Sequence, residues 1–436
     1  MRGYIEPRVL KGFRDFLPQQ ESERQRVMHL LAQVFHSYGF VPIDTPILEY
    51  TDILLGKGGG ETDKQVYRFE DQGGRDVAMR YDLTVPFARF MAAHLNELYL
   101  PFKRFHMAKA FRGENTQRGR YREFVQCDFD IVGTEAASAD SEIVLMIDRA
   151  FRTIGVDNVQ VHIAHRGVFN KLLEDLQVRE GADEVLRIVD KLRKLGEEKV
   201  RQQLKELIGA DSTNRVLSLV SANGTNEEIL DRMRSLAPAA SDHIARLSEI
   251  VTTAEQLGLG KRVIVDPSIT RGLDYYTGVV FETFLTELPE IGSVCSGGRY
   301  DDLAGLYTKE RLPGVGASIG LDRLMAGLEE LGVSSDTTSG PDVLVMCLDE
   351  KLTAHYHRIA QALREAGLST EVYPEPKKLG QQFSFAEKRG IRTAILCGES
   401  EFAVNAMNVR NLATRESTDG VSLEQAIELA RRLRER

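Results

Sequence analysis

The stretch that decides the fold runs from Phe102 to Gly133, FKRFHMAKAFRGENTQRGRYREFVQCDFDIVG. In its second half, apolar side chains occupy alternate positions, namely Val125, Cys127, Phe129 and Ile131. A period of two is typical of a β-strand with one apolar face and one polar face. Residues 102–112 form a second extended segment, and residues 113–119 supply a turn that begins and ends with glycine. We therefore predict a long β-hairpin.

The tip of this predicted hairpin is rich in arginine, with Arg112, Arg118, Arg120 and Arg122 in a short span. The guanidinium group offers five donors in a planar fork that matches a phosphate group bidentately. A ligand that carries phosphate is therefore one interpretation of the tip. A hairpin that belongs to a β-sandwich and whose polar face only contacts solvent fits this stretch equally well.

The composition is that of an ordinary globular protein. The chain has 436 residues, 42% of them hydrophobic and 28% charged, which leaves room for two or three domains. No apolar run is long enough to span a membrane, and the N-terminal residues lack the apolar core of a signal peptide. We therefore expect a cytoplasmic protein with no membrane partner. A net charge of −9 argues against general adsorption to nucleic acid, although a local contact face stays open.

The cysteines argue against a metal or disulfide framework. Cys127, Cys295, Cys347 and Cys397 are far apart, and no CxxC pair occurs. We predict no metal ligands among the residues of the chain. Cys127 falls on the apolar face of its strand, where it is expected to act as a small core residue.

Upstream of the hairpin, residues 23–38 carry apolar side chains at helical spacing, and Gly39 is expected to cap this amphipathic helix. The glycine-rich loop 56–60 does not have the spacing of a phosphate-binding loop, and we interpret it as a mobile loop near a site. Asp82 and Thr84 stand at a strand end just before a helical stretch. Helix capping is the simplest role for both residues.

Downstream of the hairpin, Asp140 is expected to cap a helix that ends at Gly155. Residues 168–258 then carry successive helical patterns with charged faces, which indicates a helical insertion. Strand character returns at residues 262–266. Residues 314–320 form a glycine-rich strand that runs into a helix, and glycine there lets a strand approach a ligand closely.

The domain organisation follows from these patterns. We predict a first domain over residues 1–333, including the insertion at about 168–258, and a linker at 334–340, whose sequence is SSDTTSG. Residues 341–436 alternate between strand and helix patterns, so we expect a compact α/β domain with a mostly parallel sheet.

Several segments, in order, resemble class II aminoacyl-tRNA synthetases and, within that class, the histidyl-tRNA synthetase family. The three class motifs are matched by YGFVPIDTPILE, FRGENTQRGRYREF and GASIGLDRL, and KGFRDFLP is similar to the family's opening. RYDLT, YREFVQCDFDIVG and, above all, RGLDYYTG are similar to segments that mark histidine specificity. The resemblance covers nearly the whole chain.

This resemblance implies an α+β fold, with an antiparallel-sheet catalytic domain over 1–333 and an α/β anticodon-binding domain over 341–436. It implies a histidine–tRNA ligase that forms histidyl-adenylate and pyrophosphate from L-histidine and ATP, then transfers histidine to the 3′ end of tRNA(His). Mg²⁺ would accompany the pyrophosphate, and the first motif would form a homodimer.

For ATP, the resemblance implies that Arg112 holds the α-phosphate and Arg323 the γ-phosphate. Glu114 would lie near the adenine, which stacks on Phe124. The residues that engage oxygens at the reacting centre would be the catalytic Arg112, Arg120 and Arg271.

For histidine, the resemblance implies that Asp82, Thr84 and Gln126 surround the α-amino group. Asp130 and Tyr276 would bond the imidazole nitrogens, and Tyr275 belongs to the same signature. Many members of the family have proline and glutamate where this chain has Tyr81 and Asp82, whereas another branch carries the same RYDLT. We interpret this departure as a difference between subtypes.

Two alternatives belong to other functional classes. A non-catalytic, histidine-binding regulatory paralogue of ATP phosphoribosyltransferase typically lacks the C-terminal domain and part of the catalytic set. Here Arg112, Arg271, Arg323 and the C-terminal domain are all present, so the enzyme is favoured. A synthetase for another amino acid is opposed by RGLDYYTG.

In the C-terminal domain, the candidate phosphate contacts are Lys377, Lys378, Lys388, Arg389 and Arg392, for which a solvated face fits at least as well.

Overall fold

The computed structural model describes residues 4–56, 64–178, 181–270, 276–301, 304–333 and 340–434. The chain divides into two compact units, one of Met1–Asp15 with Arg24–Ser334 and the other of Phe16–Glu23 with Ser335–Arg436. Most of the predicted linker, residues 334–339, lies outside the described residues, as does most of the predicted 56–60 loop. Among the described helices, none combines the length and apolar character needed to cross a membrane.

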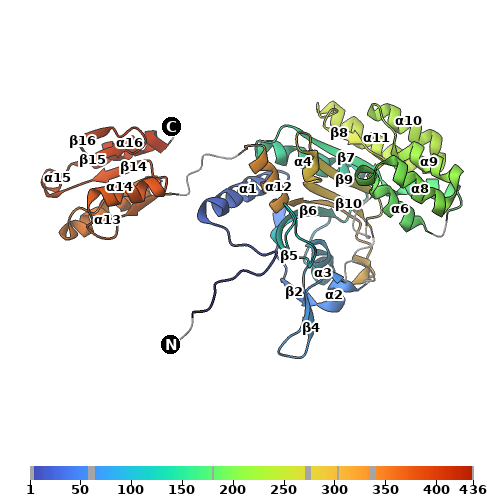
Figure 1. Cartoon of the computed structure of the whole chain (residues 1–436), viewed down its shortest axis with the longest axis horizontal. Coiled ribbons are helices and arrows are strands. Elements are labelled where there is room, and N and C mark those ends of the chain that lie inside the picture. The colour runs from blue at the N-terminus through green and yellow to red at the C-terminus, as the bar shows by residue number, and fades with distance from the viewer. Residues whose placement is uncertain are drawn as a thin grey trace. The chain divides into compact units, whose positions relative to one another are not determined.

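The first unit is built on an eight-stranded sheet with the order β1-β5-β6-β11-β10-β9-β7-β8 (Figure 1). Its neighbouring strands are antiparallel except for two pairs, β1 with β5 and β7 with β8. The strand bounds are β1 Val41–Pro42, β5 Phe102–Phe111, β6 Glu123–Val132, β7 Val159–His165, β8 Val263–Val265, β9 Val279–Leu285, β10 Cys295–Tyr300 and β11 Gly314–Gly320. The expected antiparallel-rich α+β architecture is therefore confirmed.

The predicted hairpin is present as β5 and β6, whose register runs from Phe102 opposite Val132 to Phe111 opposite Glu123. From Val125 to Val132 every residue of β6 is buried, including those of the polar face. The interpretation of that face as simply solvated is therefore wrong. The apolar face packs into the main core, where Cys127 and Phe129 are fully buried.

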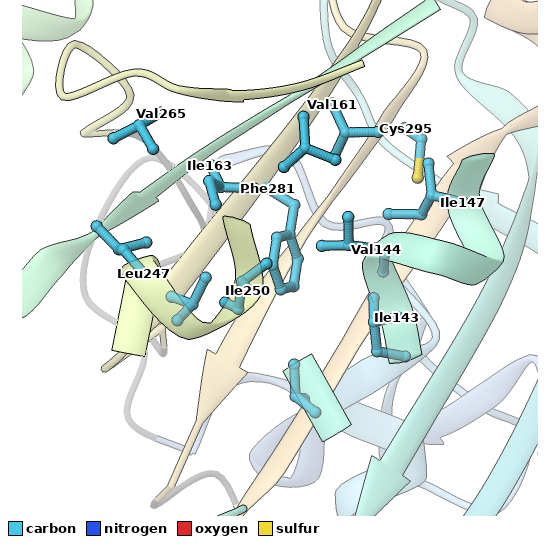
Figure 2. Packing of buried hydrophobic residues seen from close by; sticks show 14 of the residues in the cluster. Ile143, Val144, Ile147, Val161, Ile163, Leu247, Ile250, Val265, Phe281 and Cys295 are labelled. Carbon is cyan, nitrogen blue, oxygen red and sulfur yellow. The ribbon is translucent and has the colours of Figure 1, made fainter. Parts of the chain in front are cut away.

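The core of the first unit lies between the sheet and two helices, α4 (Ala137–Thr153) and α11 (Ser241–Gln256). Figure 2 shows Val144 and Ile147 of α4 and Ile250 of α11 around the ring of Phe281 from β9. Burying the apolar stripe of an amphipathic helix against a sheet supplies most of the stability of such a layer.

Helix α1 (Pro18–Ser37) begins before the predicted start at residue 23, and Gly39 follows it with φ +80°, as expected of a C-terminal cap. The predicted capping role of Asp140 is wrong, because α4 begins at Ala137. The carboxylate of Asp140 is instead buried and lies 2.8 Å from the guanidinium of Arg299. Alanine favours the helix, so the first turn extends toward the N-terminus and leaves Asp140 inside it.

The predicted helical insertion is confirmed, and its helices cluster beside the β7–β8 edge of the sheet (Figure 1). It contains, together with α11, the helices α5 Arg166–Asp175, α6 Ala182–Asp190, α7 Leu192–Leu195, α8 Glu197–Ile208, α9 Ala210–Val220, α10 Asn226–Leu236 and the 3₁₀ turn Pro238–Ala240. Thr225 and Glu228 form a capping box at the start of α10.

A smaller sheet with the order β2-β4-β3 lies beside the hairpin. It is formed by β2 Leu48–Tyr50, β3 Arg68–Glu70 and β4 Asp76–Met79, and it is accompanied by α2 Thr51–Leu55 and α3 Thr84–His94. The remaining elements of this unit are the 3₁₀ turns Pro289–Ile291 and Ala304–Leu306 and the helix α12 Leu321–Glu330.

The second unit has a five-stranded sheet with the order β13-β12-β14-β15-β16. Its elements are β12 Val343–Val345, the 3₁₀ turn Glu350–Leu352, α13 Thr353–Glu365, β13 Thr370–Val372, α14 Leu379–Lys388, β14 Thr393–Leu396, α15 Glu399–Ala403, β15 Met407–Asn411, β16 Ser417–Val421 and α16 Leu423–Arg434. Alternate residues of β12 enter two different cores, Val343 with α13 and α16, and Leu344 with α14. Helices therefore cover both faces.

The expectation of a mostly parallel C-terminal sheet is wrong for its second half. β12 pairs in parallel with β13 and β14, whereas β14–β15 and β15–β16 are antiparallel. The reason is the length of the connections, since residues 397–406 and 412–416 are both shorter than the roughly dozen residues that a parallel crossover needs.

Candidate active site

A cavity of about 1550 Å³ opens on the first unit over strands β6, β9, β10 and β11. The residues that the sequence predicted for the site and that line this cavity are Thr84, Arg112, Glu114, Arg120, Phe124, Gln126, Asp130, Tyr276 and Arg323. Asp82 is fully buried and is not among the lining residues. Arg271 and Tyr275 lie outside the described residues.

The arginine end of the cavity is built by the tip of the hairpin. Arg112 follows β5, and its Nε donates to the carbonyl oxygen of Tyr81 at 2.9 Å, which fixes the direction of the guanidinium. That guanidinium lies 5.2 Å from the ring centroid of Phe124. Arg120 stands in a tight turn in which it exchanges two backbone hydrogen bonds with Gln117. The guanidinium of Arg112 and the ring of Phe124 are therefore held side by side.

Arg323 joins these arginines because the hairpin tip packs against the start of α12. Its Nη1 donates to the carbonyl oxygen of Ser293 at 2.6 Å. Gly119 has φ +70°, and a Cβ there would lie 3.2 Å from the Cα of Arg323. Glycine at this position therefore permits the close approach of the hairpin turn to Arg323.

Sequence reasoning missed Asp322, which ties three segments together. Its Oδ2 accepts from the backbone N of Val125 at 2.8 Å, and its Oδ1 accepts from Nη1 of Arg24 at 2.8 Å. Arg14 also pairs with this carboxylate, and its guanidinium lies 3.2 Å from the ring centroid of Tyr121. The opening segment and α1 thus support the strand and helix that carry the arginines. In the sequence, the signal that could have found Asp322 was its position next to Arg323.

Buried carboxylates form a second group of side chains at and beside the cavity. The N-cap residue of α3 is Leu83, so neither Asp82 nor Thr84 holds the predicted cap position, although Asp82 accepts from the backbone N of Val85 in the first turn at 3.1 Å. Burial raises the pKa of Asp82 to about 6. Burial likewise raises the pKa of Asp128 to about 7, against the opposing effect of the Arg104 guanidinium. Thr84 Oγ1 lies 3.5 Å from Oδ2 of Asp128.

Arg104 is the second feature that sequence reasoning missed. Its side chain is 0% exposed, and Nη2 lies 2.7 Å from Oδ2 of Asp130. Tyr300 donates its hydroxyl to the other oxygen of Asp130 at 2.7 Å. The hairpin register, in which Arg104 is directly opposite Asp130, is the signal that could have found this pair.

Arginines from a hairpin and from the helix that follows a glycine-rich strand lie at one cavity over a largely antiparallel sheet. This arrangement is that of the class II aminoacyl-tRNA synthetases. Residues 12–324 match the family model described as Histidyl-tRNA synthetase, and residues 342–433 match the one described as Anticodon binding domain. The chain belongs to the histidyl-tRNA synthetase family.

Relatives of this chain cover nearly its whole length. It is 51% identical over 398 residues to the histidine–tRNA ligase of Treponema denticola, covering 90% of this chain and 89% of that protein. It is 50% identical over 421 residues to the histidine–tRNA ligase of Rhodopirellula baltica, covering 95% of each. The crystal structure of histidyl-tRNA synthetase from Nostoc is similar with a TM-score of 0.89 at 33% identity, over 99% of this chain and 100% of that one.

Proposed function

We propose that this chain is a histidine–tRNA ligase. It activates L-histidine with ATP to histidyl-adenylate and pyrophosphate, and it then transfers histidine to the 3′ end of tRNA(His). The observation that carries this proposal is the cavity that is lined both by arginines and by the buried carboxylates of Asp128 and Asp130. Membership of the histidyl-tRNA synthetase family supports it.

The arginine end is proposed to bind ATP. Arg112 would contact the α-phosphate and Arg323 the γ-phosphate, while Phe124 stacks on the adenine and Glu114 lies near it. The neighbouring positions of Arg112 and Phe124 support these assignments, because a guanidinium that can donate hydrogen bonds to phosphate lies 5.2 Å from the centroid of an aromatic ring. Arg120 and Arg271 are proposed to contact oxygens at the reacting centre.

The group of buried carboxylates is proposed to bind histidine. Asp82, Thr84 and Gln126 would surround the α-amino group, and Oδ2 of Asp82 is a buried atom without a hydrogen-bond partner among the described residues. Asp130 and Tyr276 would bond the imidazole nitrogens, with Tyr275 beside them. Oδ2 of Asp130 is likewise a buried atom without a hydrogen-bond partner in the described part of the chain, and an amino acid without ring nitrogens would leave it so, which is a strong basis for rejection.

These assignments account for the chemistry. The carboxylate of histidine attacks the α-phosphorus in line, the bond to pyrophosphate breaks, and negative charge gathers on the phosphoryl oxygens. Little covalent work falls to the protein, so alignment of the substrates and fixed positive charge supply most of the catalysis. Within the described ranges, no cluster of His, Cys, Asp or Glu is arranged to hold a metal ion. Mg²⁺ would therefore be held mainly by the phosphate oxygens, which it would neutralise.

The proposal extends to partners and location. The first motif carries exposed apolar side chains that a second copy would cover in a homodimer, namely Val41, Ile47, Leu48 and Tyr50. The C-terminal unit is proposed to contact the anticodon of tRNA. Two of the five candidate phosphate contacts there already face carboxylates, since Lys377 lies 3.0 Å from Glu375 and Arg389 lies 3.4 Å from Glu371. The protein is proposed to work in the cytoplasm.

Histidine-dependent exchange of pyrophosphate into ATP tests the function. We expect exchange with histidine and little with other amino acids. A regulatory paralogue would bind histidine without exchange, and a synthetase of another specificity would exchange with its own amino acid. Absence of histidine-dependent exchange in the purified chain would contradict the proposal.

A further inference from the structure

Arg104 is a fully buried arginine that does not line the cavity, although three residues around it do. Asp128, Asp130 and Tyr300 all line the cavity. The Arg104 guanidinium lies 2.7 Å from Asp130 and 4.0 Å from Asp128 and rests 4.1 Å from the ring centroid of Phe87. Its influence on a ligand must therefore pass through these carboxylates.

We propose that Arg104 is a positioning residue for histidine recognition, which holds Asp130 as an ionised acceptor for the imidazole N–H. This inference rests on the proposed function, because it concerns the residue that Asp130 would bind.

The geometry holds the Asp130 carboxylate from three sides. Tyr300 donates to Oδ1 at 2.7 Å, and Arg104 faces Oδ2. On β11, Gly316 is opposite Asp130, and a Cβ at Gly316 would lie 2.1 Å from Oδ1. A carboxylate has about four acceptor sites, so the hydrogen bond from Tyr300 and the nearby Arg104 charge leave room for a donor from a ligand.

The charges around Asp130 explain why a buried cation is needed there. Asp128 on β6 carries a second buried carboxyl that interacts with that of Asp130, and burial raises the pKa of the Tyr300 hydroxyl on β10, which is therefore neutral at physiological pH. Burial raises the pKa of Asp130, while Arg104 and the Tyr300 hydroxyl oppose this rise. Without Arg104, the carboxyl would take up a proton and lose an acceptor that imidazole requires.

None of the Arg104 nitrogens makes a well-directed hydrogen bond with a described residue. Its contribution is therefore mainly that of a charge, which lysine can partly replace. A buried ion pair that served stability alone would make a different prediction, because its loss would weaken folding without a specific effect on histidine.

The experiment compares Arg104→Met and Arg104→Lys with the wild type. KM for histidine and KM for ATP are measured by pyrophosphate exchange between pH values of about 6 and 9. At neutral pH we expect Arg104→Met to raise KM for histidine by about 10- to 100-fold. This factor corresponds to the loss of the hydrogen bond from the imidazole N–H to the ionised Asp130 carboxylate. The ratio of this KM to the wild-type KM at the same pH should fall as the pH rises and Asp130 ionises, because the ratio cancels the titration of Asp82, Asp128 and the substrate. The corresponding ratio for Arg104→Lys should change little.

The matched control is Arg262→Met, which removes one of the two arginines that pair with buried Asp148, and neither Arg262 nor Asp148 lines the cavity. We expect it to lower stability while KM for histidine stays at the wild-type value at every pH. A second variant, Arg104→Met with Asp130→Asn, removes both charges, so that no unpaired buried charge is left to disturb folding. It should show a raised KM for histidine that no longer recovers at high pH.

Each outcome decides the proposal. A wild-type KM for histidine in Arg104→Met, an equal rise in KM for ATP, or a pH recovery that survives in the double variant would overturn the role of Arg104. If Arg104→Met does not fold, Arg104→Gln, a second uncharged replacement, is measured in the same pH series, with the same expected and contradicting results. Absence of histidine-dependent exchange in the wild type would instead contradict the proposed function, which keeps the two failures distinct.

Discussion

Asp322 accepts a hydrogen bond from the backbone N of Val125 at 2.8 Å, although the two residues are 197 positions apart. The same carboxylate binds Arg24 and Arg14. One buried acid therefore ties the start of α12, which carries Arg323, to the strand that carries Phe124. The relative positions of the proposed phosphate and adenine contacts depend on this acid.

Removal of this acid should cost both stability and ATP binding. We expect Asp322→Ala to lower the free energy of unfolding by about 3 to 5 kcal/mol, because it leaves the buried Arg24 guanidinium without its carboxylate. KM for ATP should rise more than KM for histidine. Urea unfolding and exchange kinetics check both results. Glu174→Gln, at the exposed pair with Lys171, is the control and should change stability by less than about 0.5 kcal/mol. Equal effects of both variants would contradict the linking role.

Asp82 should reduce stability at neutral pH. The pKa of its carboxyl is raised to about 6 in the folded protein from 3.8. The folded state therefore binds the proton more tightly, and the contribution of this group to stability is complete below the unfolded pKa and lost as the pH rises through about 6. The ionised carboxylate then costs up to about 3 kcal/mol near pH 7.

The substitution Asp82→Asn removes this cost and keeps an oxygen that can accept from the backbone N of Val85. We expect the variant to be more stable than the wild type near pH 7, with an advantage that shrinks as the pH is lowered to about 4. Its KM for histidine should rise. Urea unfolding across this pH range is the measurement. Asp71→Asn serves as the control, since Arg75 lowers the pKa of Asp71, and no gain in stability is expected there. A constant advantage at all pH values would argue against titration of Asp82.

Arg271 should act in the chemical step rather than in binding. Its guanidinium is proposed to offset the charge that develops as the histidine carboxylate attacks the α-phosphorus. We expect Arg271→Ala to lose nearly all pyrophosphate exchange, by about 100-fold or more, while histidine binding measured by calorimetry is largely kept. Arg152→Ala, on the half-exposed surface of α4, is the control and should retain activity. Parallel loss of binding and exchange would assign Arg271 to substrate binding instead.

The C-terminal cations should act on tRNA and leave activation alone. Lys378, Lys388 and Arg392 are the candidates for which we describe no ion pair with a carboxylate. Replacing all three by glutamine should weaken tRNA binding and reduce the slope of log affinity against log salt by about 1 for each phosphate that the protein no longer neutralises. Histidine-dependent exchange should not change. Lys171→Gln in the first unit is the control, and an unaltered salt slope in the triple variant would remove these residues from the tRNA interface.

Much of the fold was predictable because it depends on local spacing. The period of two in residues 125–131 identified β6, and the helical spacing after residue 23 identified α1 and its glycine cap. The arginines of the hairpin tip indicated a phosphate ligand before any strand order was known. Most of the site residues that the family motifs named line the cavity.

The tertiary structure alone decided which polar side chains became buried partners. Arg104 resembles any charged residue near a strand when only the sequence is considered, yet it is fully buried against Asp130 because β5 lies beside β6 in one register. Asp140 has the sequence position of a cap, but it pairs with Arg299 from a strand that lies far along the chain. Spacing along a chain determines which face a side chain occupies. The cost of burying a charge is met only by a partner that folding brings near, and no local pattern names that partner.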